Sequence, residues 1–221
     1  FGGEIMRGKS ISRTLINLRV NGTKLTGAGI DLGAKDGSAS QYRFLEIDGT
    51  VEYTDLRPER EDVWAIDLEK PFPVSDQSQD FLMLFHVLEH LYDYRACIRE
   101  SFRILKPGGM LIGAVPFLER IHPDPDDHFR YTKSTLTRMF SEAGFSPVMV
   151  EPIGRGPFTI AAHMIHGLVP TPPLKWVNAM VGVALDGALR RLSRKDWGPV
   201  YAIAYYFELE KPSAPKPSPI Q

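Results

Sequence analysis

A short, uninterrupted apolar run constrains the fold of this chain more than any other feature. Residues 80–85 read Asp-Phe-Leu-Met-Leu-Phe, with no polar residue after the first. A strand with apolar side chains on both faces is typical of a parallel sheet that helices cover on both sides. Residues 110–115 form a second such run, directly after Lys106-Pro107-Gly108-Gly109, a sequence that ends a helix and turns the chain.

Strand-like and helix-like segments alternate along most of the chain. Besides these two runs, we expect strands over 26–33, 51–56, 63–67, 147–153 and 200–209. Amphipathic periodicity predicts helices over 4–20, 93–105 and 132–143. Strands separated by helices predict an α/β fold, with a Rossmann-like, mostly parallel seven-stranded sheet flanked by helices.

The 221 residues suit one large domain, which we assign to residues 1–211. Residues 155–199 are expected to form a helical lid or insertion before the last strand. The Pro- and Ser-rich residues 212–221 are expected to be disordered. The single cysteine, Cys97, excludes an intramolecular disulfide, and a net charge of -1 argues against nucleic acid as a partner.

The most apolar long stretch, residues 174–192, is a poor candidate for a membrane span because Lys175, Asn178 and Asp186 interrupt it. The N-terminal residues lack a signal-peptide pattern, so the expected location is the cytoplasm. The simpler interpretation of this stretch is that it forms a lid on the sheet or a homodimer contact. A sharper hypothesis is a peripheral membrane contact through 158–195, since the stretch ends in basic residues, Arg190, Arg191, Arg194 and Lys195.

A glycine-containing turn and three acidic residues lie where a parallel sheet binds ligands. The turn, residues 31–37, follows the first expected strand, and its glycines let a ligand approach the backbone. Asp55 ends the second strand, where a carboxylate accepts hydrogen bonds from both hydroxyls of a ribose. Asp67 ends the third strand, where an acid can meet an adenine amino group. With Asp31, these acids fall at one edge of the sheet.

Over residues 26–154 the chain resembles the class I S-adenosylmethionine-dependent methyltransferases. The matching segments, in the family's order, are 30–37, 53–56, 65–68, 80–91 and 103–109. The most specific are Val87-Leu88-Glu89-His90 and Leu105-Lys106-Pro107-Gly108-Gly109, which are similar to the family's VLEH and LKPGG signatures. Residues 122–132 further resemble a subgroup found with enzymes of saccharide and cell-envelope assembly, which is an argument by association.

The resemblance implies that S-adenosylmethionine is the cofactor. It further implies methyl transfer, to an oxygen of a small-molecule, saccharide or lipid-linked acceptor. Asp31 and Gly33 would border the methionine part of the cofactor, Gly37 would close the turn, and Asp55 would bind the ribose. The contacts to the adenine and around the sulfonium would come from Asp67, the Leu68 backbone and His86.

One position departs from the family's pattern. The first turn usually has three glycines at alternate positions; here Gly33 and Gly37 match, but Lys35 takes the middle place. Lys35 must follow a different path, turn its side chain away, or pair with the cofactor carboxylate. The departure supports one alternative, a binding protein that has kept the fold and lost activity. A second alternative is an NAD-dependent oxidoreductase, which shares the ribose-binding acid but is disfavoured by the two signature segments.

Methyl transfer to oxygen is an in-line displacement that benefits from alignment of the reactants and from a general base. Two histidines, His122 and His128, lie in an acidic loop after the fifth strand, on the substrate side by topology. Either could take a hydroxyl proton at neutral pH. We therefore take His122, His128 and Asp127 as candidate catalytic residues, although these histidines and Asp127 could instead order the loop.

A metal site is a further option that the sequence raises. His86, Glu89 and His90 have the i, i+3, i+4 spacing that puts three side chains on one face of a helix, and His122 or His128 could add a ligand. Some methyltransferases have a similar metal-binding set, with Glu in place of His86. Because the Glu-His pair is also common in metal-free relatives, the sequence-based expectation is that no metal is bound.

Overall fold

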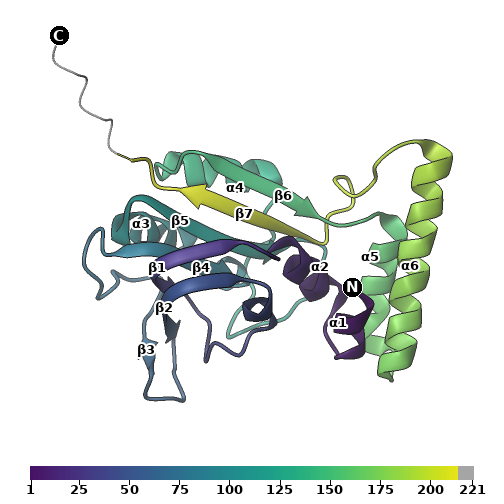
Figure 1. The fold of residues 1–221 in the computed structure, drawn as a ribbon, viewed down its shortest axis with the longest axis horizontal. Helices are drawn as coiled ribbons and strands as arrows, with labels where there is room; N and C mark the ends of the chain where they lie inside the picture. Colours follow the sequence, from purple (N-terminus) through teal and green to yellow (C-terminus); the bar gives the residue numbers. More distant parts are fainter. Residues whose placement is uncertain (214–221) are drawn as a thin grey trace, which may run out of the picture.

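The computed structural model describes residues 1–213, which form one seven-stranded sheet with helices on both faces (Figure 1). The strand order is β3-β2-β1-β4-β5-β7-β6. The first five strands run parallel to one another, whereas β7 is antiparallel to both β5 and β6. The mostly parallel α/β sheet expected from the sequence is therefore confirmed. The strands are β1 (Lys24–Asp31), β2 (Glu46–Asp55), β3 (Val63–Ala65), β4 (Gln79–Phe85), β5 (Leu105–Pro116), β6 (Val148–Ile153) and β7 (Ala204–Glu210).

Nine helical segments connect these strands within the described residues. The α-helices are α1 (Gly2–Met6), α2 (Ile11–Arg19), α3 (Tyr94–Ile104), α4 (Lys133–Glu142), α5 (Pro157–Ile165) and α6 (Pro172–Ser193). The 3₁₀ helices are η1 (Ser40–Arg43), η2 (Leu88–His90) and η3 (His166–Leu168). The sequence predicts disorder over residues 212–221. Residues 214–221 of this segment lie outside the described residues.

Several boundaries expected from the sequence are wrong, among them the start of β5, which is Leu105 and not Met110, and the start of β7, which is Ala204 and not Val200. The single helix expected over 4–20 is two helices, because Gly8 adopts φ 80° and Ser10 caps α2 by accepting a hydrogen bond from the Arg13 N–H (3.1 Å). The second strand begins at Glu46 rather than Val51. Its first residues are polar, but they pair in register with β1, from Lys24 opposite Glu46 onward.

Strand β4 separates two apolar cores, as its continuous apolar sequence predicts. Leu82 and Leu84 face a core that includes residues of α3 and α4. Phe81, Met83 and Phe85 face a second core that includes residues of α1, α2, α5 and α6. All five side chains are buried.

The chain order reverses between β1 and β4, since β2 and β3 lie on one side of β1 while β4 and β5 lie on the other. In open parallel sheets the loops diverge at such a point, and ligands bind in the crevice outside the carboxyl ends of the strands. The loops after β1, β4 and β5 all leave the sheet at this edge, so the fold places a site there before any side chain is considered.

Helices α5 and α6 form a hairpin between β6 and β7, where the sequence predicts a helical insertion. The hairpin lies beside α1 at one end of the sheet (Figure 1). The Asp186 carboxylate of α6 accepts hydrogen bonds from the N–H groups of Phe158 (3.0 Å) and Thr159 (2.8 Å), so it caps the start of α5. Among residues 1–213, no helix combines the length and hydropathy that crossing a membrane requires.

Substituting Asp186 tests this packing. The carboxylate is 4% exposed, and Asp186→Ala leaves two donors at the start of α5 without their acceptor. We expect the free energy of unfolding to fall by about 1–3 kcal/mol, as measured by chemical denaturation. Asp62→Ala, which removes only an exposed pair with Arg60, should cause no measurable loss and serves as the control. Equal losses in the two variants would show that the cap does not hold the hairpin.

Candidate functional site

The carboxyl edge of the sheet opens into a cavity of about 840 Å³. Its walls come from α2 and the turn before it, from residues 31–41, from the loops after β4 and β5, and from the helical hairpin. This volume lies in the range of small-molecule sites, and the cavity sits at the reversal of strand order described above.

Asp31 ends β1 on the inner wall of the cavity. Its carboxylate is 2% exposed and accepts a hydrogen bond from the Tyr42 hydroxyl. Burial raises the pKa of Asp31 to about 7, against the opposing effects of the Tyr42 hydrogen bond and of the Arg13 charge. Asp31 is therefore a carboxyl group whose charge a bound cation would stabilise.

The turn after Asp31 needs glycine at two positions. Gly33 has φ 76° and Gly37 has φ 69°, values that side chains with a Cβ rarely adopt. A Cβ on Gly33 would lie 2.8 Å from Val87 Cγ2, and one on Gly37 would lie 2.5 Å from the Tyr53 ring. The Gly33 N–H donates to Thr54 Oγ1 (3.0 Å), which ties the turn to β2.

Lys35 turns its side chain away from the glycine turn. It adopts φ 60°, and its Nζ lies 2.7 Å from Asp124 Oδ2 in the loop after β5. The Asp124 hydrogen bond raises the pKa of the Lys35 ammonium. Of the three possibilities that the sequence leaves open for Lys35, the structure shows a side chain that turns away from the glycine turn.

The acids predicted for the ribose and the adenine lie at the expected edge, outside the cavity wall. Asp55 ends β2 and accepts the Arg57 N–H (2.7 Å), while its carbonyl accepts the Ile66 N–H (3.0 Å). Asp67 follows β3, pairs with Lys70 (2.8 Å) and accepts the Glu69 N–H. The Leu68 side chain is buried in the core. The cofactor contacts assigned to Asp55, Asp67 and Leu68 stay predictions.

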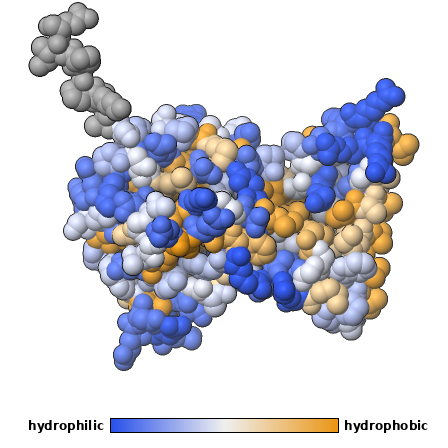
Figure 2. Space-filling view, viewed as in Figure 1, coloured by the Kyte–Doolittle hydropathy of each residue, from blue (hydrophilic) through white to orange (hydrophobic). Residues whose placement is uncertain are grey.

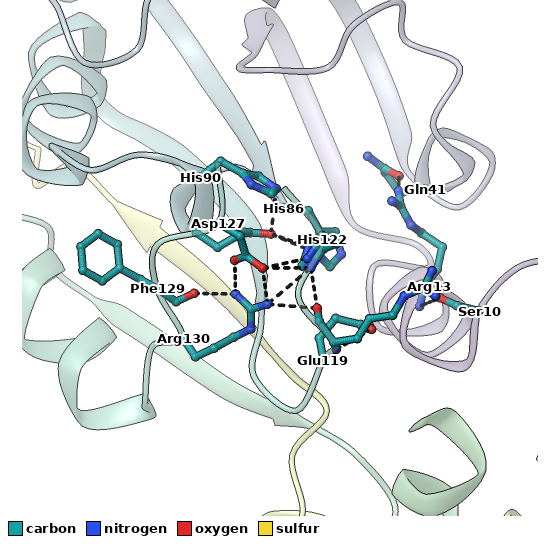
Figure 3. Close-up of polar contacts among 12 residues, drawn as sticks. Ser10, Arg13, Gln41, His86, His90, Glu119, His122, Asp127, Phe129 and Arg130 are labelled. Atoms are coloured by element: carbon teal, nitrogen blue, oxygen red, sulfur yellow. Dashed lines mark hydrogen bonds and ion pairs between the residues drawn. The ribbon is translucent and has the colours of Figure 1, made fainter. Parts of the chain in front are cut away.

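Three imidazoles, those of His86, His90 and His122, lie close together (Figure 3), and the buried carboxylate of Glu89 faces all three. Glu89 is fully buried, and its Oε1 lies 3.6 Å from His86 Nδ1, 3.8 Å from His90 Nε2 and 3.8 Å from His122 Nε2. Burial raises the pKa of Glu89, but the facing His122 and His86 rings more than offset it and lower the pKa to about 2. The segment is a single 3₁₀ turn rather than the helix considered above, and His86 precedes it with φ 58°.

The three predicted catalytic residues differ in where they lie. His122 lines the cavity. His128 does not, because its exposed ring packs edge-on against Tyr92 with centroids 5.5 Å apart. Asp127 pairs with Arg130, which lowers the pKa of the carboxyl, and accepts the His122 N–H (2.9 Å). Asp127 thus orders the loop that carries His122, and the structure does not bring all three residues together.

The sequence does not predict several of the residues that form the cavity wall. Arg13 comes from α2, and burial lowers the pKa of its guanidinium against the charges of Glu89 and Asp31. His163 of α5 lies 2.9 Å from Glu119. Burial raises the pKa of Glu119, and His163 more than offsets this effect, so the net shift is downward. These residues are far apart in sequence, and only the packing of α2 and the hairpin onto the sheet edge brings them together.

Comparisons with known proteins agree with this geometry. Residues 27–113, which span β1 to β5, match the methyltransferase domain family. A probable S-adenosylmethionine-dependent methyltransferase of Mycolicibacterium smegmatis is 32% identical over 104 residues, or 44% of this chain and 40% of that protein. One of Mycobacterium tuberculosis is 31% identical over 136 residues, or 58% of this chain and 49% of that protein. The chain thus spans less than half the length of these relatives.

Two known structures share the fold. Phosphoethanolamine N-methyltransferase 2 of Haemonchus contortus, in complex with phosphomonomethylethanolamine and S-adenosylhomocysteine, aligns with a TM-score of 0.58 at 13% identity, over 91% of this chain and 52% of that one. A Haloferax volcanii methyltransferase, in complex with the Trm112 activator, aligns with a TM-score of 0.58 at 16% identity, over 94% and 92%. The sequence match over residues 27–113 is therefore to a methyltransferase domain, and solved methyltransferase structures share the fold of this chain.

Proposed function

We propose that this chain transfers a methyl group from S-adenosylmethionine to a hydroxyl oxygen of a saccharide or lipid-linked acceptor. The observation that carries the proposal is that one cavity joins the glycine turn after β1 to a wall of histidines and basic side chains. A methyl donor bound at the turn would share this space with an acceptor.

The residues at the turn fit the cofactor. Asp31 and Gly33 both line the cavity, and Val87 packs so closely against Gly33 that a Cβ there would collide with it. When bound, S-adenosylmethionine supplies a methyl group on a sulfonium, whose departure leaves a neutral sulfur. Asp31 and Gly33 would border its methionine part. The ribose and adenine would lie along Asp55, Asp67 and the Leu68 backbone at the ends of β2 and β3.

The cavity also holds basic side chains without ion-pair partners among residues 1–213. Lys9, Arg120 and Lys175 line it, and none of the three has an ion-pair partner within 4.0 Å among residues 1–213. Guanidinium and ammonium groups bind phosphate and carboxylate through charge-assisted hydrogen bonds. This wall favours an anionic acceptor, such as a saccharide phosphate or the head of a lipid-linked saccharide.

His122 is the predicted catalytic residue that suits activation of the acceptor hydroxyl. It lines the cavity, and its Nδ1 lies 2.9 Å from the Arg120 carbonyl oxygen. Because a carbonyl only accepts hydrogen bonds, Nδ1 carries the proton in the neutral ring and Nε2 carries the lone pair. We assign hydroxyl activation to His122, and loop ordering to Asp127.

The helical hairpin supports a membrane-bound acceptor. Apolar side chains between 42% and 83% exposed line its outer side: Phe158, Met164, Ile165, Leu168, Leu174, Val177, Val181 and Leu185. Figure 2 shows this apolar surface along α6, with hydrophilic residues at the end of the helix. The basic residues Arg190, Arg191, Arg194 and Lys195 lie there, a pattern that suits an anionic membrane surface. We propose that an anionic membrane surface contacts the outer side of the hairpin.

Cofactor binding separates the proposal from its rivals. S-adenosylhomocysteine at about 100 times its dissociation constant should stabilise the protein by roughly 2.7 kcal/mol, a rise in Tm of about 5–10 °C, whereas NAD should not. Asp55→Ala should weaken binding by about 10- to 100-fold, since it removes hydrogen bonds to a charged acceptor. Lys35→Gly should leave binding within about threefold, because the Lys35 side chain pairs with Asp124 and not with the turn.

Asp62, an acid on the loop after β2, provides the matched control. The variant Asp62→Ala should bind S-adenosylhomocysteine as tightly as the unaltered protein does. No shift with S-adenosylhomocysteine would favour the inactive binding protein, and a shift with NAD alone would favour the oxidoreductase. Loss of binding in Lys35→Gly would show that the ammonium contacts the cofactor.

Methyl transfer itself is tested with labelled S-adenosylmethionine and saccharide phosphates, with and without a lipid anchor. His122→Ala should lower the transfer rate by about 10²-fold or more while cofactor affinity is kept, because the variant removes only activation of the hydroxyl. His128→Ala should keep most of the rate. Equal rates in His122→Ala and the unaltered protein would remove His122 from the mechanism.

Co-sedimentation with vesicles tests the membrane surface. We expect binding to vesicles rich in phosphatidylglycerol at low salt and little binding to phosphatidylcholine. The double variant Val177→Ser/Val181→Ser should lower the bound fraction severalfold. Leu56→Ser, an equally exposed apolar residue after β2, should not. A stable dimer by sedimentation velocity, without vesicle binding, would instead make the hairpin a contact between copies.

A further inference from the structure

We propose that Glu89, His90 and His122 bind a divalent transition-metal ion, with Zn²⁺ as the ion to test first. The sequence-based expectation is that no metal is bound, because the Glu-His pair is common in metal-free relatives. The folded loop after β5 adds a third group, His122, and the geometry of the three points to a built metal site.

The donor atoms are already gathered. One ligand atom from each residue lies within 4.8 Å of the other two, and Glu89 Oε1 is 3.8 Å from both His90 Nε2 and His122 Nε2. In a tetrahedral zinc site with bonds of about 2.0–2.1 Å, neighbouring donors lie about 3.3 Å apart. The two distances from Glu89 Oε1 exceed this spacing by about half an ångström each.

Both imidazoles are oriented as metal ligands are. His90 Nδ1 lies 2.6 Å from the Asp126 carbonyl oxygen, and His122 Nδ1 lies 2.9 Å from the Arg120 carbonyl oxygen. Each Nδ1 therefore donates its proton to the backbone, and each neutral ring points an Nε2 lone pair at the Glu89 carboxylate. Carbonyl groups that hold the second ring nitrogen in this way are typical of histidines that bind metals.

The carboxylate lacks any other partner. Glu89 is fully buried, and neither of its oxygens accepts a hydrogen bond within residues 1–213. A buried ionised carboxylate is unfavourable unless it is paired or coordinates a metal. A cation among the carboxylate and the two Nε2 lone pairs would satisfy all three. His86 contributes a buried Nε2 without a partner, but it lies outside the ligand set.

The proposed ion would face the acceptor half of the cavity. His90 and His122 line that cavity, and three protein ligands leave at least one coordination position open. With its Nε2 on the ion, His122 would act on the acceptor hydroxyl through the metal and not as a free base, and a hydroxyl bound there would lose its proton to solvent more readily. Its oxygen would then form the bond to the methyl carbon while the carbon–sulfur bond breaks and sulfur keeps the electron pair. This role rests on the proposed function, whereas metal binding does not.

Metal content is measured on untagged protein that has been stripped with a chelator and reloaded. We expect one equivalent of Zn²⁺ by mass spectrometry and calorimetry, and visible d–d bands of a nitrogen–oxygen site when Co²⁺ is used instead. Mg²⁺ in excess should not displace either ion, because imidazole ligands favour transition metals. Glu89→Gln and His122→Ala should each weaken Zn²⁺ binding at least tenfold and change or remove the Co²⁺ bands.

His128→Ala is the matched control, since His128 lies in the same loop with its ring away from the cluster. Circular dichroism checks the fold of each variant, and the partly exposed His122 provides a test even if Glu89→Gln unfolds. Less than a tenth of an equivalent in the reloaded protein, or equal binding in His122→Ala and His128→Ala, would overturn the proposal. Loss of S-adenosylhomocysteine binding with zinc binding intact would count against the proposed function alone.

Discussion

The η2 turn, Leu88–His90, holds the loop after β5 in place. The Glu89 carbonyl accepts the N–H groups of His128 (2.8 Å) and Phe129 (3.2 Å), and the Tyr131 hydroxyl donates to the Leu88 carbonyl (3.0 Å). The same turn carries the buried Glu89 side chain that faces the three histidines. Backbone hydrogen bonds thus fix the loop, and the loop in turn presents His122 to the carboxylate.

Within that loop, the Asp127–Arg130 pair sets the position of His122. Asp127 accepts the His122 N–H, and Arg130 Nη2 donates both to Asp127 and to the Arg120 carbonyl oxygen. The loop also reaches the glycine turn, where Asp124 pairs with Lys35. An exposed pair of this kind contributes little to stability. It does link the cofactor side of the cavity to the loop that lines the acceptor side, so one loop contacts both halves of the site.

The features that sequence reasoning predicts are those that local pattern determines. The apolar run of β4 specifies a strand buried on both faces, and the acids Asp31 and Asp55 end neighbouring parallel strands as expected. The break between α1 and α2 depends on a single positive φ at Gly8, which a periodic pattern does not reveal. Arg13, Glu119 and His163 come together in the cavity wall only because α2 and α5 pack at the sheet edge. The convergence of His122 on Glu89 likewise depends on contacts between segments about thirty residues apart in sequence.

One structure would test directly whether the two halves of the site share a cavity. Crystals grown with S-adenosylhomocysteine and Zn²⁺, with diffraction recorded at the zinc absorption edge, would locate both groups. We expect ligand density against Asp31 and Gly33, with its sulfur facing the cavity, and one anomalous peak among Glu89, His90 and His122. Ligand density elsewhere, or a sulfur separated from the acceptor cavity by protein, would contradict the proposed methyl transfer. An anomalous map without a peak at Glu89 would contradict the metal site.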